Sequence, residues 1–236
     1  MKVIALLSIL LASPALAGGF KAPEGCQTVM TIQSRGCYVA NYYTCEAGPG
    51  NLWRVDHDQE GAFYLSMIDN DTQWIESTDL GDGTVQTLDP SPLDPASASG
   101  LLATGYDSFI FSLSKDNGEH SNVRGFDRLT GETVTIDGVA LERTEYEYTE
   151  TDDEGNILRQ SRGREYILRE PRTFLSGTSE WWDGENWLPL EGHPVDFAFP
   201  DDKGFEASQP IFDCDAVMSM APLVPPDAAL LAKVKG

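Results

Sequence analysis

Hydrophobic and polar residues alternate in short runs along most of this chain, and clusters of turn-forming residues separate the runs. The turn signals include Asp69-Asn70-Asp71, Asp116-Asn117-Gly118 and Asp183-Gly184. Short, regularly spaced runs rich in β-branched and aromatic residues are typical of antiparallel strands. The pattern therefore predicts an all-β fold. The expected strands are 28–33, 37–45, 62–68, 108–113, 132–136, 139–149, 157–168 and 195–199.

Several connections between these runs are short enough to force hairpins. Asp137-Gly138 is a favoured two-residue turn pair between the runs at 132–136 and 139–149. Asp153-Glu154-Gly155 fits a three-residue loop with glycine at the left-handed position. Successive hairpins make a meander, and a long meander must curl because a flat sheet leaves its edges exposed. We therefore expect a strongly curved antiparallel meander, either an open barrel or a clam-like half-barrel.

Only two segments have the pattern of a helix. Asp94-Pro95 can cap and start a short helix over 96–103, which would end before Gly105. A second helix is expected over 226–235, with an acidic residue near its start and lysines near its end. We expect these one or two helices to cover the open side of the sheet. No change in composition divides the chain, so residues 18–236 are expected to form a single β-rich domain.

The first seventeen residues have the layout of a secretory signal peptide. Met1-Lys2 is a short positive start, Val3 to Leu11 is an apolar run, and Ala15-Leu16-Ala17 supplies small residues before a cleavage point. The apolar run is too short to span a membrane, which takes about 20 apolar residues. Cys26 is the first cysteine and lies well past Ala17, which argues against a lipid anchor. We expect a periplasmic or secreted protein with residues 1–17 removed.

The four cysteines, Cys26, Cys37, Cys45 and Cys214, are expected to form disulfides, because an exported chain meets an oxidising compartment. If Arg35-Gly36 is a two-residue hairpin loop, opposed positions sum to 71 and Cys26 faces Cys45. This favours Cys26–Cys45 with Cys37–Cys214, which would clasp the first hairpin to the C-terminal part of the domain. Two other pairings stay open: Cys37–Cys45 with Cys26–Cys214, and Cys26–Cys37 with Cys45–Cys214.

The chain is strongly acidic, with 16 Lys+Arg against 38 Asp+Glu and a net charge of −22. Such a surface repels phosphate backbones, which makes nucleic acid a poor candidate partner, and we expect none. Half of the basic residues are arginines between Arg124 and Arg172, interleaved with glutamates. On antiparallel strands these charges would mostly pair across the ladder at the surface, each pair contributing about 0.2–1 kcal/mol.

The motifs that mark common chemistries are missing from the sequence. It contains no Gly-x-Ser-x-Gly nucleophile elbow and no phosphate-binding glycine loop. The acidic segment after Glu150 resembles a calcium loop in its early spacing, but position twelve is Ser161 instead of glutamate. His57, His120 and His193 lie far apart and near turn or polar residues, which favours solvated histidines over a metal triad. We therefore expect no metal and no cofactor, and more readily a binding role than an enzymatic one.

The strongest candidate for ligand contact is the segment Trp181-Trp182-Asp183-Gly184-Glu185-Asn186-Trp187, which holds three of the five tryptophans. Adjacent Trp181 and Trp182 point to opposite faces if they lie in a strand. One of them is then available to line a cavity and stack on a ligand. The alternative is ordinary cross-strand packing of Trp182 against Trp187. We therefore name Trp181, Trp182 and Trp187 as candidate ligand-binding residues.

These observations support one leading function and two alternatives. The leading prediction is a non-enzymatic carrier in the cell envelope, which holds an apolar or amphipathic ligand inside the curved sheet. One alternative is an envelope module that binds another protein through an edge strand or its acidic face. The other is an exported hydrolase whose catalytic carboxylates are not identified among so many acidic residues. In element order the layout looks like the half-barrels of bacterial periplasmic lipoprotein carriers and of lipocalin-type binders, a likeness of fold alone.

Overall fold

The computed structural model describes residues 19–214, and in this range the chain forms one antiparallel sheet of 14 strands. The predicted signal peptide and the predicted helix at 226–235 lie outside the described residues. The strands are β1 (Cys26–Ser34), β2 (Tyr38–Cys45), β3 (Leu52–His57), β4 (Ala62–Ile68), β5 (Trp74–Asp79), β6 (Val85–Leu88), β7 (Tyr106–Lys115), β8 (His120–Ile136), β9 (Val139–Thr151), β10 (Ile157–Leu168), β11 (Thr173–Leu175), β12 (Thr178–Trp182), β13 (Trp187–Glu191) and β14 (Pro194–Ala198). The predicted fold class, a curved antiparallel meander, is confirmed.

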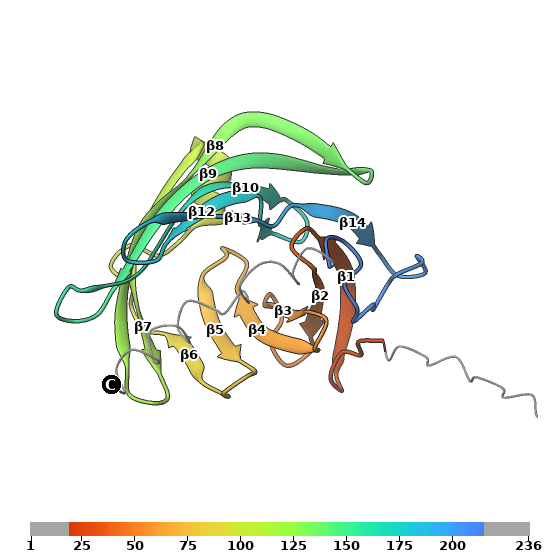
Figure 1. Cartoon of the computed structure of the whole chain (residues 1–236), viewed down its shortest axis with the longest axis horizontal. Coiled ribbons are helices and arrows are strands. Elements are labelled where there is room, and N and C mark those ends of the chain that lie inside the picture. The colour runs from red at the N-terminus through yellow and green to blue at the C-terminus, as the bar shows by residue number, and fades with distance from the viewer. Residues whose placement is uncertain (1–18, 215–236) are drawn as a thin grey trace, which may run out of the picture.

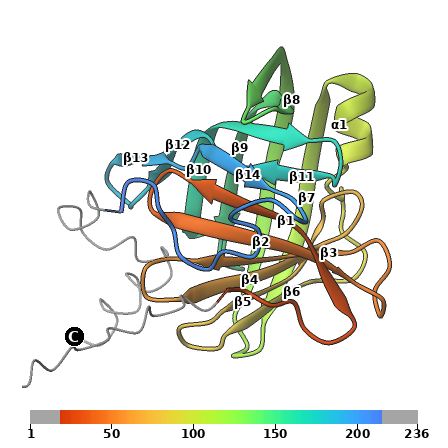
Figure 2. The same ribbon diagram turned by 90° about the vertical axis from the view of Figure 1, so that its right-hand side faces the viewer.

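The sheet curls round an interior without closing (Figures 1 and 2). Its strand order runs β13-β12-β10-β9-β8-β7-β6-β5-β4-β3-β2-β1-β14, and β11 also pairs with β10. The two ends of this order, β13 and β14, are consecutive in the chain and are joined only by Gly192 and His193. The link is bonded on both sides, because Gly192 N donates to Gly177 O at 2.9 Å and Arg35 N donates to His193 O at 2.8 Å.

The largest core cluster joins the first strands to strands from the second half of the chain. Met30, Ile32 and Tyr42 of β1 and β2 pack with Leu141 of β9 and with Leu168 of β10. These side chains are 6 % exposed or less. Burying a large apolar side chain contributes about 1.5–3 kcal/mol, so this cluster is a main source of the stability of the fold.

The first hairpin pairs Cys26 with Cys45, as predicted, but its loop length and its strand register differ from the prediction. The loop is three residues long, 35–37, because Ser34 pairs with Tyr38. Near the turn the pairing is therefore shifted by one residue from the register predicted for a two-residue Arg35-Gly36 loop. A register shift between Thr28 and Met30 then restores the predicted alignment at Cys26 and Cys45. A β-bulge of this kind inserts one extra residue in one strand.

A segment over 205–214 crosses the other face of β1 and β2 and is fixed by buried polar side chains. Thr31 Oγ1 accepts a hydrogen bond from Glu206 N at 2.8 Å, and Asn41 Nδ2 donates to Ala207 O at 2.8 Å. In the same segment, Gln33 Nε2 donates to Gln209 O at 3.0 Å, and Gln33 Oε1 accepts a hydrogen bond from Ile211 N at 3.1 Å. The Cys37–Cys214 disulfide then closes the segment onto the hairpin loop. Both bonds of the favoured pairing, Cys26–Cys45 and Cys37–Cys214, are present.

The two predicted turns differ in outcome. Asp137 and Gly138 form a two-residue loop between Ile136 and Val139, with φ values of 47° and 79°, as predicted. The second turn is longer than predicted and spans 152–156, because Thr151 pairs with Ile157. Gly155 has a φ of 86° and so occupies the left-handed conformation expected of it.

The predicted first helix forms over Ala98–Thr104 as α1, and it starts two residues later than predicted. Ser97 caps it, since its Oγ accepts a hydrogen bond from Gly100 N at 3.0 Å, and Gly105 ends it in the left-handed conformation. Asp94 instead exchanges two backbone hydrogen bonds with Ile110 of β7. Within residues 19–214 there is no helix long and apolar enough to cross a membrane.

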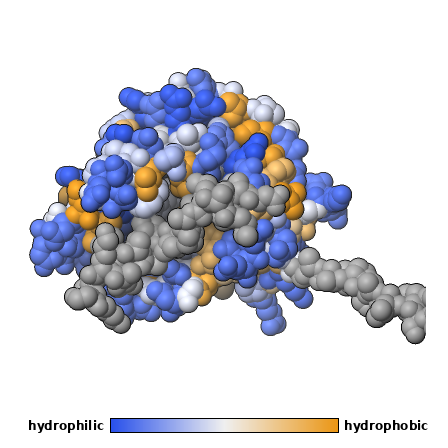
Figure 3. Space-filling model, viewed as in Figure 1, coloured by the Kyte–Doolittle hydropathy of each residue, from blue (hydrophilic) through white to orange (hydrophobic). Residues whose placement is uncertain are grey.

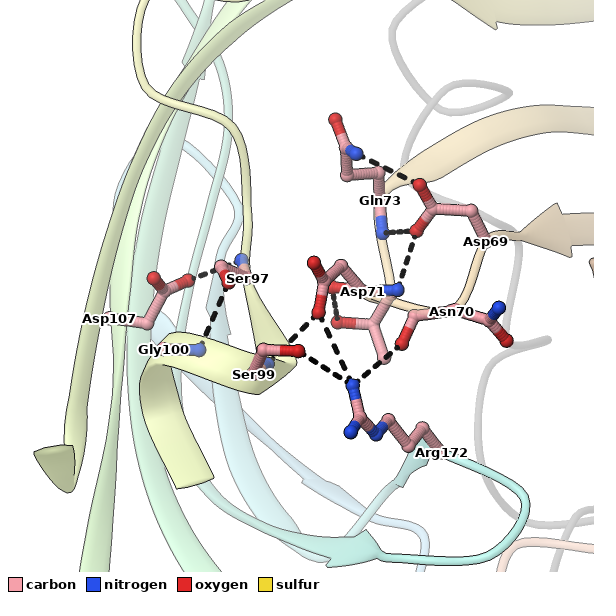
Figure 4. Close-up of polar contacts among 10 residues, drawn as sticks. Asp69, Asn70, Asp71, Gln73, Ser97, Ser99, Gly100, Asp107 and Arg172 are labelled. Atoms are coloured by element: carbon pink, nitrogen blue, oxygen red, sulfur yellow. Dashed lines mark hydrogen bonds and ion pairs between the residues drawn. The ribbon is translucent and has the colours of Figure 1, made fainter. Parts of the chain in front are cut away.

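A polar network ties α1 to two distant loops (Figure 4). Asp71, between β4 and β5, accepts hydrogen bonds from Ser99 N at 3.0 Å and, through its backbone oxygen, from Ala98 N at 3.0 Å. Arg172, between β10 and β11, donates to Ser99 Oγ at 2.7 Å and to Asn70 O at 3.3 Å. The helix therefore joins the β4–β5 and β10–β11 connections at one end of the sheet.

The arginines and glutamates of the second half pair across the ladder, as predicted. Arg162 meets Glu180 at 3.0 Å, and Arg169 meets Glu142 at 2.7 Å. Arg128 meets Glu145 on the paired strands β8 and β9. Hydrophilic residues gather along the top of the space-filling view, where Figure 1 places β8 and β9 (Figure 3).

Candidate functional site

The interior of the curved sheet receives polar side chains from β2 and β3. Ile32 lies opposite Ala40, Ala40 lies opposite Asp56, and Tyr42 lies opposite Arg54, so these residues share one face. Ile32, Ala40 and Tyr42 belong to the main core cluster. Because side chains alternate along a strand, Arg54 and Asp56 are carried to that same inner face.

Arg54 and Asp56 form an ion pair inside the protein. Arg54 Nη2 lies 3.0 Å from Asp56 Oδ2; Asp56 is only 6 % exposed, whereas the Arg54 side chain is 32 % exposed. Burial raises the pKa of Asp56, while the Arg54 guanidinium opposes that rise. Burial acts to lower the pKa of Arg54, but Asp56 and the neighbouring tyrosines outweigh it and raise that pKa.

The pair leaves one donor and one acceptor unused. Among the described residues, Arg54 Nε and Asp56 Oδ1 are buried and have no hydrogen-bond partner. An unpaired buried polar atom costs about 1–3 kcal/mol, and native proteins keep few of them. The pair is therefore hydrogen-bonded incompletely by the protein alone.

A cavity of about 160 Å³ lies beside this pair. It separates the inner face of β1–β3 from the segment that runs through β11, β13 and β14. Tyr38 and Gly192 both belong to its lining, and the Tyr38 hydroxyl donates to Gly192 O at 3.0 Å. The lining combines apolar and polar side chains: Ile32, Ala40, Phe63, Leu175, Leu190 and Pro194 are apolar, and Ser34, Tyr38, Tyr42, Arg54, Asp56, Ser176 and Glu191 are polar. The arrangement can hold a small molecule that has one polar end.

A second polar group lies further along the inner face, on β8 and β10. The ring of Trp74 on β5 contacts Phe111 on β7 at 5.3 Å and Tyr148 on β9 at 5.6 Å between centroids. These contacts cross from one part of the curved sheet to another, so this face of β7 and β9 is turned inward. By strand alternation the same face carries Asp127 of β8 and Glu165 of β10.

Both of these carboxyl groups are hard to ionise. Burial, reinforced by the charge of Asp107, raises the pKa of Asp127 to about 7. Burial, reinforced by the charge of Asp127, raises the pKa of Glu165 to about 8, and Arg54 lowers it slightly. Glu165 is therefore near enough to Arg54 of β3 to interact with its charge.

We expect these two groups to make stability depend on pH. Carboxyl groups in an unfolded chain have a pKa of about 4, so between about pH 4 and pH 8 the folded state binds more protons. The free energy of unfolding contributed by these groups therefore falls as pH rises through this range. Glu165→Gln and Asp127→Asn each replace one of these carboxyl groups by a neutral amide, so the free energy of unfolding falls less as pH rises. We expect each variant to be more stable than the wild type by about 1–3 kcal/mol at pH 8.5.

Urea unfolding at pH 5 and pH 8.5 measures this difference. Glu154→Gln, in the exposed 152–156 loop, is the matched control and should leave the pH dependence unchanged. If the stability of the wild type, Glu165→Gln and Asp127→Asn depends on pH in the same way, the two carboxyl groups do not have the raised pKa values described above.

The structure does not bring the three candidate tryptophans together. Trp182 pairs with Trp187, with ring centroids 5.6 Å apart, and the guanidinium of Arg162 lies 4.0 Å from the centre of the Trp187 ring. Trp181 lies on the opposite face, between Ser161 of β10 and Leu188 of β13. Trp182 and Trp187 therefore have the cross-strand packing that the sequence offered as the alternative.

The three histidines sit in separate surroundings. His57 is 7 % exposed and packs against Phe20, and burial lowers its pKa. His120 lies between Asp153 at 2.6 Å and Asp89 at 3.0 Å, and hydrogen bonds to these carboxylates raise its pKa. His193 contacts Glu191. Over residues 19–214 no three His, Cys, Asp or Glu side chains are placed to hold a metal ion.

Comparison with known proteins returned no relative: no family model, no curated protein and no solved structure matches the chain. The likeness to lipoprotein carriers and lipocalin-type binders therefore remains one of element order.

Sequence reasoning missed Arg54 and Asp56. The signal was present, because Leu52-Trp53-Arg54-Val55-Asp56-His57 alternates with a period of two. Charged residues at alternate positions of a strand ordinarily mark the solvent side, which hid the inward direction of this face.

Proposed function

We propose that this protein is an exported, non-enzymatic binding protein that holds a small amphipathic molecule in the cavity beside Arg54 and Asp56. The observation that carries the proposal is the ion pair of Arg54 and Asp56, with one unpartnered donor and one unpartnered acceptor, in the lining of a cavity that also presents apolar side chains. In this proposal the polar end of the ligand lies toward Arg54 and Asp56, and its apolar part lies against Ile32, Phe63 and Leu190.

The lining and the size of the cavity support a bound molecule at this place. Ligand sites are typically concave and mostly apolar, with a few polar groups that fix the orientation of the ligand. At about 160 Å³ the cavity is smaller than a typical site for a drug-sized molecule, so it suits a small ligand or one end of a longer one.

Export is supported by two independent features. Residues 1–17 have the pattern of a signal peptide, and all four cysteines are paired. Paired cysteines are usual outside the cytosol and uncommon within it. We place the protein in the periplasm or in the secreted fraction.

Native mass spectrometry of protein purified from its own compartment tests the proposal. We expect a bound small molecule that is lost on denaturation, and a competing environment-sensitive dye that binds once it has been removed. Leu190→Trp, which fills the cavity from β13, should abolish both signals while the protein stays folded. A clean unliganded mass with no dye binding would overturn the proposal.

The two alternatives from the sequence stay predictions. A module that binds a partner by strand addition needs a long regular edge, whereas β13 and β14 have five residues each and Pro189 interrupts β13. An acidic-face partner or a hydrolase activity has no particular geometric support among the described residues.

A further inference from the structure

The charge of the cavity wall limits the kind of polar group that it can accept. Arg54 stays protonated, and its Nη2 lies 3.0 Å from Asp56 Oδ2, the geometry of a guanidinium–carboxylate pair in which the two charges cancel. Glu191, the other charged residue at the cavity, is directed to His193, and its side chain is 53 % exposed, so water screens it. A ligand with a net charge would therefore be buried without a countercharge, which is costly.

The unused atoms of the pair specify what the ligand must offer. Arg54 Nε is a donor and needs an acceptor, and Asp56 Oδ1 is an acceptor and needs a donor. Both atoms are shielded from solvent in this structure, so a ligand in the cavity reaches them only when the Arg54 and Asp56 side chains turn toward it. A carboxamide has an oxygen that accepts and a nitrogen that donates on neighbouring positions.

We propose that the cavity recognises the neutral, donor-and-acceptor end of an amphipathic molecule, of the carboxamide class, in preference to a carboxylate or an ammonium group. This inference rests on the proposed function and specifies its ligand class. The apolar side chains of Ile32, Phe63 and Leu190 provide the surface for the hydrocarbon part of the same molecule.

A matched series of three ligands tests the inference: hexanamide, hexanoate and hexylamine, titrated into the full mature protein by calorimetry at pH 7.5. They share one hydrocarbon chain and differ only in the polar end. We expect hexanamide to bind about tenfold more tightly than either charged ligand, because only it avoids burying an unpaired charge. A carboxylate or amine that binds as tightly as the amide would overturn the inference and leave the proposed function standing.

Asp56→Asn is the diagnostic variant. It keeps the shape of the side chain and removes the charge that balances Arg54, so the cavity becomes positive. We expect the preference to change from hexanamide to hexanoate by about tenfold. Circular dichroism checks that the variant is folded. An unchanged order of affinities in folded Asp56→Asn would also overturn the inference.

Leu190→Trp separates the inference from the proposed function. This variant fills the cavity and leaves the ion pair in place, so all three ligands should lose affinity together. If none of the three binds the wild-type protein, the proposed cavity function fails for this size of ligand. If all three bind and Leu190→Trp binds them equally well, the cavity is not their site and both proposals fail.

Discussion

Replacing both Cys37 and Cys214 with serine is expected to lower the free energy of unfolding by about 3–5 kcal/mol. The disulfide joins residues separated by 177 positions in sequence. A cross-link over so long a loop removes much conformational freedom from the unfolded chain. It also holds the 205–214 segment, whose backbone bonds the buried side chains of Thr31, Gln33 and Asn41.

The paired substitution Cys26→Ser with Cys45→Ser is the matched control. Its loop spans only 19 positions, and its two cysteines already face one another on paired strands. Chain-entropy arithmetic gives at most about 3 kcal/mol for that bond. Urea unfolding of the two double variants under identical conditions gives the comparison. A smaller loss for the Cys37 and Cys214 variant than for the control would contradict the long-loop argument.

Arg54→Ala is expected to lower the free energy of unfolding by about 2–4 kcal/mol at pH 8. The substitution leaves Asp56, which is 6 % exposed, without its cation. The pKa of Asp56, already raised by burial, then rises further because Arg54 no longer opposes the effect. The loss should be smaller at pH 5, where more of the orphaned carboxyl group is protonated, and urea unfolding at the two pH values measures it.

A double variant separates the buried charge from the loss of packing. Arg54→Met with Asp56→Leu replaces the ion pair by apolar groups of similar size, which is often neutral or stabilising. We expect it to recover most of the stability that Arg54→Ala loses. If the double variant and Arg54→Ala are equally unstable at both pH values, the uncompensated carboxylate is not the cause.

The first hairpin illustrates how far sequence reasoning reaches. Turn chemistry and cysteine positions led to the pairing of Cys26 with Cys45, although the loop contains three residues, 35–37, where two were predicted. A bulge near Met30 compensates for the extra residue. Bulges depend on the packing of both strands against the rest of the core, so local sequence does not locate them.

The candidate site was harder to foresee for a related reason. The period of β3 is visible in the sequence, but its inward direction is set by strands that lie far away along the chain. Asp56 lines the same cavity as Leu175 of β11 and Leu190 of β13, which come from the second half of the chain. The helix α1 shows the same limit on a smaller scale, since its start is also fixed by Asp71 from the β4–β5 loop.

The sheet does not close by hydrogen bonds between its two edge strands, but the two-residue link between β13 and β14 joins those edges through the chain itself. Unrolling the sheet would require either that the 192–193 link stretch or that one terminal strand detach. A proteolytic nick between Gly192 and His193 would remove this connection between the two edges of the sheet. The two fragments would still migrate as one molecule until a reductant was added, because Cys37 lies on one side of the cut and Cys214 on the other.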